Sequence, residues 1–352
     1  MNSTPERLRA VIATDLSEEL SAELDELLPS VEVVRDSSVV RPMRWPADWG
    51  GDPAHERTPA QQQAFDELVD SADVLFSIPD ADAAALTRTV RSNPKLRWVH
   101  IMAAGGGAQV KAADLTAEEL ERVTFTTSAG VHGSTLAEFA VFGVLAGAKR
   151  LPELQRAQSE KEWADRWLMK HLDEMTVLVI GLGGIGKAVA TRLSAFGATV
   201  WGTSRSGAPV DGVDRLVSLD ELNDVVAEVD AIVVTLPGTD QTLHLVGEEL
   251  LQNVKPGVII ANVGRGTVID ETALLAALDD GRVAYAALDV FEVEPLPASS
   301  PLWEHPNVLV SPHTAALSEQ EDRRIVRLFA DNARRFLAGE PLRNVVDTVE
   351  FY

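Results

Sequence analysis

The stretch of the chain that most restricts its fold runs from Thr176 to Ser206. It consists of an apolar run, three glycines in G-x-G-x-x-G spacing (Gly181, Gly183 and Gly186), a helical pattern and a second apolar run. In a βαβ unit of this kind the first glycine permits a tight turn, the second lets the backbone approach a pyrophosphate, and the third lets the helix lie close on the strand. The sequence therefore predicts a nucleotide-binding βαβ unit.

The start of the predicted helix supplies the anion site. Gly184, Ile185 and Gly186 form its first turn, where free N–H groups and the positive end of the helix dipole face a bound phosphate. The site therefore binds an anion without a basic side chain. A glycine triplet alone also occurs in ordinary tight turns, but here a strand, a helix and a second strand flank it in the required order.

The residues after the second apolar run bear on the choice of cofactor. NAD-specific sites normally place an acidic residue about 20 residues beyond the glycines, and here Ser204 stands in that position. Ser204 and Ser206 can donate hydrogen bonds to a 2′-phosphate, and Arg205 can add a charge-assisted pair. We therefore expect NADP as the preferred cofactor, with NAD as the alternative if Arg205 only forms ion pairs with nearby carboxylates.

Composition excludes several classes of protein. The chain has 352 residues, enough for two domains, and a formal charge of −23, which disfavours nucleic acid and anionic lipid as partners. No apolar run of about 18 residues occurs and the first ten residues are polar, so we expect neither a membrane span nor a secretory signal. The absence of cysteine excludes disulfides and zinc–thiolate sites and fits a cytoplasmic protein without a metal.

The pattern of apolar runs predicts an α/β fold with two doubly wound parallel sheets, one before about Gly130 and one after it. A final amphipathic helix is expected over Ser318–Leu337. The strands expected before Gly130 lie at 8–13, 31–34, 74–78, 96–102 and 123–127, and those after it at 177–180, 200–206, 231–237, 257–263, 284–290 and 307–312.

Two segments depart from this alternation. Arg41–Gln63 is polar and rich in Pro and Trp, and we expect a long loop whose tryptophans pack beneath it or border a pocket. A largely apolar helix begins at Ser134 and leads into a charged arm that bears Trp163 and Trp167. Because a helix that is apolar on nearly all sides must be buried, we expect this region to pack partly against a second subunit.

Polar residues follow several of the strands predicted after Gly130. Arg265, Glu294 and His313 come after three of them, and Asp289 lies at the end of its own strand. Each residue taken singly is compatible with a surface ion pair, a solvated carboxylate or a packing histidine. Together they supply what reduction of a carbonyl requires, namely a cation for the substrate, a general acid and a carboxylate that orients the acid.

These motifs as a set resemble the D-isomer-specific 2-hydroxyacid dehydrogenase family. VIGLGGIG, ANVGRGTVID, ALDVFEVEPLP and LVSPHTA follow in the family's order and at similar spacing. The resemblance covers nearly the whole chain, least of all Arg41–Gln63. It implies a flavodoxin-like substrate domain over 1–130 and 318–352, with an inserted NAD(P)-binding Rossmann domain over 131–317.

The resemblance also implies roles for individual residues. Arg265 resembles the substrate-binding arginine, Glu294 the carboxylate partner and His313 the acid/base, which also contacts substrate. Asp289 resembles the residue that contacts the nicotinamide carboxamide. Further positions of the family's sites are Ala104 and Gly105, whose amides hold the substrate carboxylate, and Leu236, Pro237, Val263 and Ala315, which contact the cofactor. One departure is Gly107, which stands where the family often has an aspartate.

We therefore expect an enzyme that reduces a small 2-oxo acid, such as glyoxylate or hydroxypyruvate, to the D-2-hydroxy acid, and that acts as a homodimer. One alternative is oxidation of D-3-phosphoglycerate, disfavoured because no further domain follows Tyr352. The other is a cofactor-sensing, corepressor-like interaction protein, disfavoured because the polar residues that the reaction needs are all present.

Overall fold

The computed structural model describes residues 7–205, 207–349 and 351. The chain divides into two compact units. Unit 1 contains the residues up to His132 and those from Leu317 onward, and unit 2 contains Gly133–Ala316. Each unit is built on one parallel sheet with helices on both faces, so the predicted fold class is confirmed.

The sheet of unit 1 has the strand order β2-β1-β3-β4-β5, which is the flavodoxin-like order. Every pair of neighbouring strands in it is parallel. The strands are β1 (Arg9–Ile12), β2 (Glu32–Val34), β3 (Val74–Phe76), β4 (Trp98–Ile101) and β5 (Thr124–Thr127).

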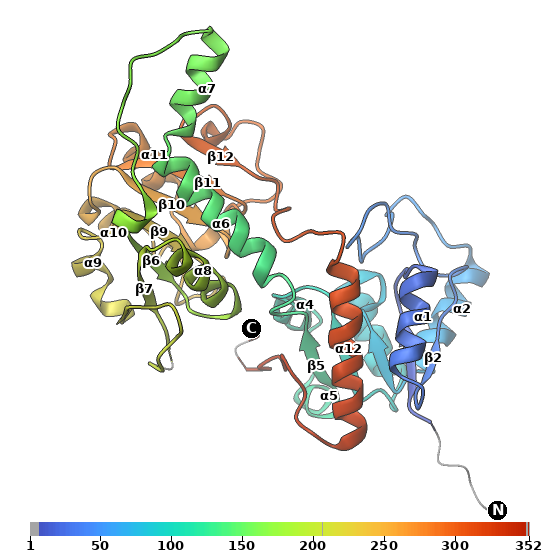
Figure 1. Ribbon diagram of the computed structural model, residues 1–352. Helices are drawn as coiled ribbons and strands as arrows, with labels where there is room; N and C mark the ends of the chain where they lie inside the picture. The colour runs from blue at the N-terminus through green and yellow to red at the C-terminus, as the bar shows by residue number, and fades with distance from the viewer. Residues whose placement is uncertain (1–6, 206, 350, 352) are drawn as a thin grey trace, which may run out of the picture. The chain divides into compact units, whose positions relative to one another are not determined.

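Alternate residues of these strands pack on opposite faces of the sheet, as the pleat requires. Val11, Leu75 and Val99 face one apolar cluster, which includes side chains of α2 (Pro59–Asp70), α3 (Ala83–Ser92) and α4 (Gly107–Ala112). Phe76 and Trp98 face the other cluster, which includes side chains of α1 (Glu18–Leu27) and α12 (Glu321–Ala338). The blue α1 and the red α12 therefore lie side by side although they come from opposite ends of the chain (Figure 1).

The sheet of unit 2 has the order β12-β11-β10-β9-β6-β7-β8, again with every neighbouring pair parallel. The order reverses at β6, so β6 and β9 form the switch point at which ligands bind in open α/β sheets. The strands are β6 (Thr176–Ile180), β7 (Thr199–Thr203), β8 (Arg215–Val217), β9 (Ala231–Val234), β10 (Val258–Asn262), β11 (Val283–Leu288) and β12 (Val308–Val310).

Helices cover both faces of this second sheet. The apolar cluster on one face includes side chains of α6 (Gly133–Ala148) and α8 (Gly184–Ala195). The cluster on the other includes side chains of α9 (Leu222–Val225), α10 (Glu248–Asn253) and α11 (Glu271–Asp279). The remaining helices of the chain are α5 (Ala117–Arg122), α7 (Leu151–Glu160) and the 3-10 turns η1 (Pro79–Ala81), η2 (Leu172–Glu174), η3 (Leu219–Glu221), η4 (Gly266–Val268) and η5 (Pro301–Trp303).

The structure corrects the extent of the loop expected over Arg41–Gln63. Its last part is already helical, because α2 begins at Pro59. Thr58 caps this helix and exchanges hydrogen bonds with Gln61, which is the capping-box arrangement. The sequence also gave no indication of the short edge strand β8. No helix in the described part of the chain is both long and apolar enough to cross a membrane.

Candidate active site

The glycine turn of unit 2 connects β6 to α8, whose first residues are Gly184 and Ile185. Gly181 has a φ of 105°, a conformation that side chains disfavour, and a Cβ on Gly186 would collide with the carbonyl oxygen of Gly181. A Cβ on Gly183 would meet no atom within 4 Å, so the space outside this residue is open. The turn therefore fits a pyrophosphate group, held by the N-terminus of α8.

Two threonines at strand ends fix this turn. The backbone N–H of Gly181 donates to Oγ1 of Thr203 at 2.8 Å, and that of Leu182 donates to the carbonyl oxygen of Thr203 at 2.8 Å. The hydroxyl of Thr235 donates to the carbonyl oxygen of Gly181 at 2.5 Å. Sequence reasoning missed both threonines, although each stands at the end of a strand that neighbours the glycine turn.

The predicted 2′-phosphate contacts directly follow Thr203, so they lie beside the glycine turn. Ser204 is partly buried and Arg205 is exposed to solvent. Ser206 lies outside the described residues. The position of Ser204 and Arg205 is therefore compatible with a bound adenosine ribose, since both follow the carboxyl end of β7.

The other predicted cofactor contacts lie in unit 2 near the same edge of the sheet. Leu236 packs on the glycine turn, where its Cδ2 lies 2.8 Å from the place that a Cβ of Gly181 would take. Pro237 follows Leu236, Val263 is buried directly after β10, and Ala315 is partly buried against the apolar cluster that contains α6 and α8.

Arg265 lies in a turn that follows β10. Asn262, the last residue of the strand, braces this turn: its side chain accepts from the N–H of Gly264 at 3.0 Å and donates to the carbonyl oxygen of Arg265 at 3.1 Å. Gly266 contacts the backbone of Phe291 so closely that any side chain there would collide with it. The Arg265 turn is thus held against the loop that leads to Glu294, and Asn262 is a third residue that sequence reasoning missed.

The structure brings Glu294 and His313 together. Oε2 of Glu294 lies 2.7 Å from Nδ1 of His313, and Oε1 accepts a hydrogen bond from the backbone N–H of Phe291 at 3.0 Å. Because the carboxylate only accepts, Nδ1 carries a proton and Nε2 is the ring nitrogen that remains for a ligand. The His313 side chain is about half exposed, and its φ of 52° lies in the left-handed region.

Asp289 holds the turn that carries His313. One carboxylate oxygen, Oδ1, accepts hydrogen bonds from the Ser311 hydroxyl at 2.6 Å and from the backbone N–H groups of Thr314 and Ala315 at 3.0 Å each. The other oxygen, Oδ2, is buried and has no hydrogen-bond partner among the described residues. Burial raises the pKa of Asp289, while these hydrogen bonds oppose the increase. A nicotinamide carboxamide, which carries an N–H donor, fits that unpaired oxygen.

The glycine-rich turn of unit 1 follows β4. Ala104 is partly buried and Gly105 is exposed. Three consecutive glycines predict an anion nest suited to a carboxylate, but neither Gly105 nor the two glycines after it adopt a positive φ, so the turn lacks the alternating conformation of such a nest. Gly106 is needed for a different reason, because a Cβ there would lie 2.5 Å from Cγ2 of Ile101. Gly107 is the first residue of α4.

A cavity of about 300 Å³ opens beside this turn within unit 1. Its apolar part includes Trp49, whose ring meets that of Phe76 edge-on at a centroid distance of 6.1 Å. Trp45 is half exposed and does not line it, although both tryptophans come from the loop predicted before Gln63. The residues that line the cavity are Ala47, Asp48, Trp49, Gly50, Ser77, Ile78, Ala81, Ile101, Met102, Ala103, Gln109, His132 and Glu321.

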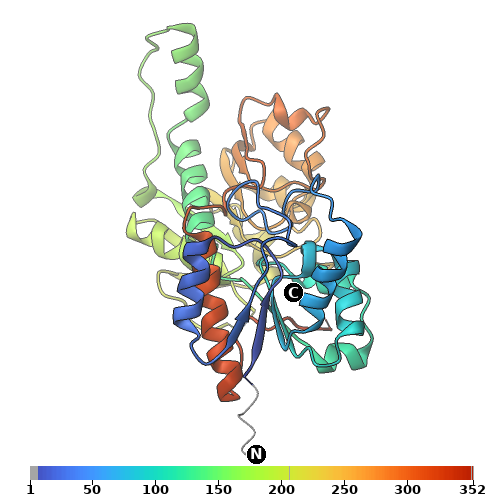
Figure 2. The ribbon, with the colours of Figure 1, turned by 90° about the vertical axis from the view of Figure 1, so that its right-hand side faces the viewer.

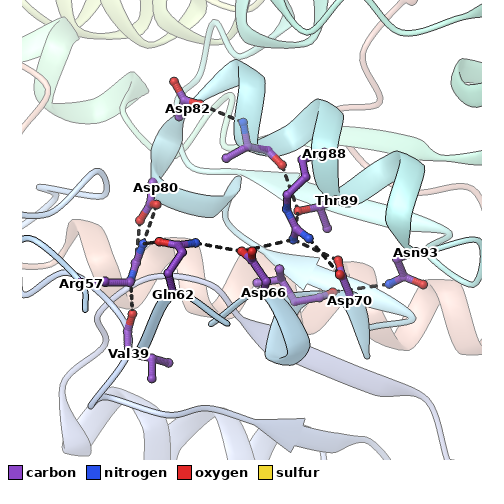
Figure 3. Close-up of polar contacts among 12 residues, drawn as sticks. Val39, Arg57, Gln62, Asp66, Asp70, Asp80, Asp82, Arg88, Thr89 and Asn93 are labelled. Carbon is purple, nitrogen blue, oxygen red and sulfur yellow. Dashed lines mark hydrogen bonds and ion pairs between the residues drawn. The ribbon is translucent and has the colours of Figure 1, made fainter. Parts of the chain in front are cut away.

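Arg57 and Asp80 form a buried ion pair (Figure 3), and the residue after Asp80, Ala81, lines the cavity. Arg57 places Nη1 and Nη2 each 2.7 Å from an oxygen of Asp80, donates from Nε to the carbonyl oxygen of Val39, and lies over the ring of Phe65. Asp80 and its neighbour Ala81 both have a positive φ, which costs free energy in residues other than glycine. The bidentate pair therefore holds a strained turn that faces the cavity.

Comparisons with known proteins show the family of the chain. Residues 141–315 match the family model for the NAD-binding domain of D-isomer specific 2-hydroxyacid dehydrogenases. A glyoxylate/hydroxypyruvate reductase B of Yersinia enterocolitica is 33% identical over 82% of this chain and 87% of its own length. A D-3-phosphoglycerate dehydrogenase of Mycobacterium tuberculosis is 33% identical over 78% of this chain but only 52% of its own length.

Solved structures agree with this class. A D-isomer specific 2-hydroxyacid dehydrogenase from Xanthobacter autotrophicus, in complex with NADPH and MES, is 32% identical and has a TM-score of 0.78 over 98% of this chain and all of that one. The fold and site thus define an NAD(P)-dependent oxidoreductase that acts on CH–OH groups. The chain belongs to the D-isomer-specific 2-hydroxyacid dehydrogenase family, so the family and the enzyme class predicted from the motifs are confirmed.

Proposed function

We propose that the protein reduces a small 2-oxo acid, of the glyoxylate or hydroxypyruvate type, to the D-2-hydroxy acid, with unit 1 as the substrate domain and unit 2 as the NAD(P) domain. The observation that carries this proposal is the contact of 2.7 Å between Glu294 and His313 at the carboxyl edge of the second sheet. A histidine oriented by a carboxylate is suited to give a proton to a carbonyl oxygen and to take it back.

The cofactor, when bound, supplies or accepts the hydride at the substrate carbon. Arg265 binds the carboxylate and the reacting oxygen, where its planar fork of donors suits both groups. His313 holds the proton at Nε2 and gives it to that oxygen, while Glu294 keeps Nδ1 protonated and stabilises the charged ring. In unit 1, the backbone amides of Ala104 and Gly105 bind the substrate carboxylate.

We further propose NADPH as the preferred cofactor. Ser204 and Arg205 support this, because they stand where an NAD-specific site has an acidic residue. The similar Xanthobacter enzyme was solved with NADPH, which is compatible with the same preference. A second candidate reaction is the oxidation of D-3-phosphoglycerate, which is favoured by the name of the Mycobacterium relative alone.

The proposal is tested by following oxidation of NADPH and of NADH in the presence of glyoxylate and hydroxypyruvate, with product configuration determined by chiral chromatography. We expect D-glycerate from hydroxypyruvate and a higher kcat/KM with NADPH. No oxidation of either cofactor with any 2-oxo acid would overturn the reaction, and a higher kcat/KM with NADH would overturn only the cofactor preference.

We also propose a homodimer formed through the arm that follows α6. Helix α7 and the segment after it extend away from the sheet of unit 2 (Figure 2). Trp163 is fully exposed and Leu168 is 95% exposed, which is costly for side chains of this size unless a second copy covers them. Light scattering at micromolar concentration should give twice the mass of one chain, and Trp163→Ser should shift the protein toward monomer.

A further inference from the structure

The cavity of unit 1 carries two buried polar atoms that the proposed reaction does not use. Glu321 is 3% exposed and lines the cavity, and its Oε2 has no hydrogen-bond partner among the described residues. Trp49 lines the same cavity, and its indole N–H likewise has no partner in the described part of the chain. A buried polar atom without a partner costs about 1–3 kcal/mol, so a ligand that satisfies both atoms gains that free energy.

The two atoms need hydrogen-bond partners of opposite type, one a donor and the other an acceptor. Glu321 accepts through Oε1 from Nε2 of His132 at 2.7 Å, so its remaining oxygen needs a second donor. The indole of Trp49 needs an acceptor. A hydroxyl group is the smallest group that both donates and accepts a hydrogen bond. The cavity is therefore matched to a ligand that carries a hydroxyl.

The charges around the cavity disfavour a ligand with an anionic side chain. Among the residues that line it, Asp48 and Glu321 are acidic and none is lysine or arginine. Asp48 is paired with Arg44, whose Nε lies 2.7 Å from Oδ2, whereas the ion-pair partner of Glu321 in the described structure is the imidazole of His132. Burial and the charge of Glu321 raise the pKa of the neighbouring Asp322, which supports a locally negative potential. An anionic side chain would meet the charge of Glu321 without a lysine or arginine among the lining residues to offset it.

We propose that this cavity receives the side chain of the 2-oxo acid and selects a neutral, hydroxyl-bearing side chain over a methyl group and over phosphate or carboxylate. The inference rests on the proposed function, because the cavity reaches Ala103, next to the amides of Ala104 and Gly105 that are proposed to hold the substrate carboxylate. It assigns Glu321 and Trp49 as specificity-determining residues and favours hydroxypyruvate over phosphorylated 2-oxo acids.

The wild-type enzyme provides the first test, through kcat/KM for hydroxypyruvate, pyruvate, 3-phosphohydroxypyruvate and oxaloacetate. We expect hydroxypyruvate to exceed pyruvate by about a hundredfold, because loss of the hydroxyl leaves both buried atoms unpaired. We expect 3-phosphohydroxypyruvate and oxaloacetate, whose side chains are anionic, to fall behind by a similar factor or more. Reduction of pyruvate or 3-phosphohydroxypyruvate as efficiently as hydroxypyruvate would overturn the inference and leave the proposed function intact. Failure to reduce any 2-oxo acid would overturn the proposed function itself.

Two variants then assign the residues. Glu321→Gln keeps the shape and removes the charge, so the kcat/KM ratio of 3-phosphohydroxypyruvate to hydroxypyruvate should rise about tenfold or more, since unit charges roughly 5–8 Å apart interact by at least that factor at an effective dielectric constant of 20. Trp49→Phe removes the donor, so the ratio of hydroxypyruvate to pyruvate should fall about fivefold to tenfold.

Matched controls are Glu319→Gln and Trp45→Phe, which change the same residue types at exposed positions outside the cavity. Their substrate ratios should equal those of wild type. Ratios within one variant cancel any general loss of activity, and thermal melting shows whether each variant is folded. Folded Glu321→Gln and Trp49→Phe variants with wild-type ratios would overturn the assignment. If Glu321→Gln does not fold, the wild-type series and Trp49→Phe decide.

Discussion

Asp289 in unit 2 and Glu321 in unit 1 are both buried carboxylates with one hydrogen-bonded oxygen and one oxygen that finds no partner within residues 7–205, 207–349 and 351. Oδ1 of Asp289 accepts three hydrogen bonds from the turn that carries His313, so this carboxylate fixes the turn at the carboxyl edge of the sheet. The side chain of Glu321 makes one hydrogen bond within the described part of the chain, to His132, and lines a cavity. This difference matches the roles proposed above, in which unit 2 carries the chemistry and unit 1 selects the substrate.

The largest expected effect tests the chemical half of this comparison. His313→Ala should lower kcat for every 2-oxo acid by 10² to 10⁴-fold, the usual contribution of a positioned general acid, while the ratios among substrates stay as in wild type. Stopped-flow fluorescence should show nearly unchanged NADPH binding. His171→Ala, an exposed histidine of the same unit, is the matched control. A His313→Ala enzyme with nearly wild-type kcat would contradict the proposed role.

The next effect tests whether the Arg57–Asp80 ion pair stabilises the turn beside the cavity of unit 1. Arg57→Met removes the bidentate partner of Asp80 and leaves its largely buried carboxylate with the longer pair to Arg41, at 3.7 Å, so we expect a loss of about 3 kcal/mol in the free energy of unfolding. Urea denaturation measures it. Arg35→Met removes an exposed pair with Asp25 and should cost less than about 1 kcal/mol. Equal losses in the two variants would show that the Arg57–Asp80 pair has no special role.

A smaller effect concerns the cofactor. Arg205→Ala should weaken NADPH binding tenfold to a hundredfold, or about 1.5–3 kcal/mol, through loss of a charge-assisted contact to the 2′-phosphate. The Kd for NADH should change less than twofold, because NADH lacks that phosphate. Isothermal titration with both cofactors gives the two values. Equal weakening of both would mean that Arg205 supports the loop rather than the phosphate.

The smallest effect concerns the pH dependence of unit 1. Complete burial lowers the pKa of His100 to about 3, whereas it is about 6.5 in an unfolded chain, so between these values the unfolded state binds the proton and the folded state does not. Stability from this group is complete above about pH 6.5 and is lost as the pH falls toward 3, by roughly 2 kcal/mol at pH 5.

Denaturation of wild type and His100→Asn at pH 8 and pH 5 measures this contribution. The difference between the two pH values should be about 2 kcal/mol smaller in the variant, in which Asn does not titrate. His171→Asn, at an exposed position, should behave as wild type. An unchanged difference in His100→Asn would contradict the assignment.

The fold and the enzyme class were predictable because their signals are local. The glycine turn needs three residues within six positions, and the residues at the strand ends share one edge as soon as the strands are parallel. The start of α2 was also readable, since Thr58, Pro59 and Gln61 form a capping box that the prediction overlooked. Edge strand β8 has only three residues and alternates too briefly to be detected.

The cavity of unit 1 was not predictable for a different reason. His132 and Glu321 are 189 residues apart, and neither lies in a motif that signals burial or pairing. Their contact forms because α12 packs on the first sheet, and that tertiary packing cannot be predicted from a local sequence pattern. In the same way, no local pattern distinguishes Trp49, which lines the cavity, from Trp45, which lies in the same loop and is half exposed.

The pairing of α1 with α12 has a consequence for the order of events at the ribosome. Until α12 is made, the face of the first sheet that holds Trp98 lacks the partner that later stacks on it through Phe329, at a centroid distance of 4.9 Å. Unit 2 is one continuous segment and is synthesised in between. At 5–20 residues per second, the nascent N-terminal segment waits roughly ten to forty seconds with that apolar face covered by α1 but not by α12, and binding by a chaperone during this interval would prevent its aggregation.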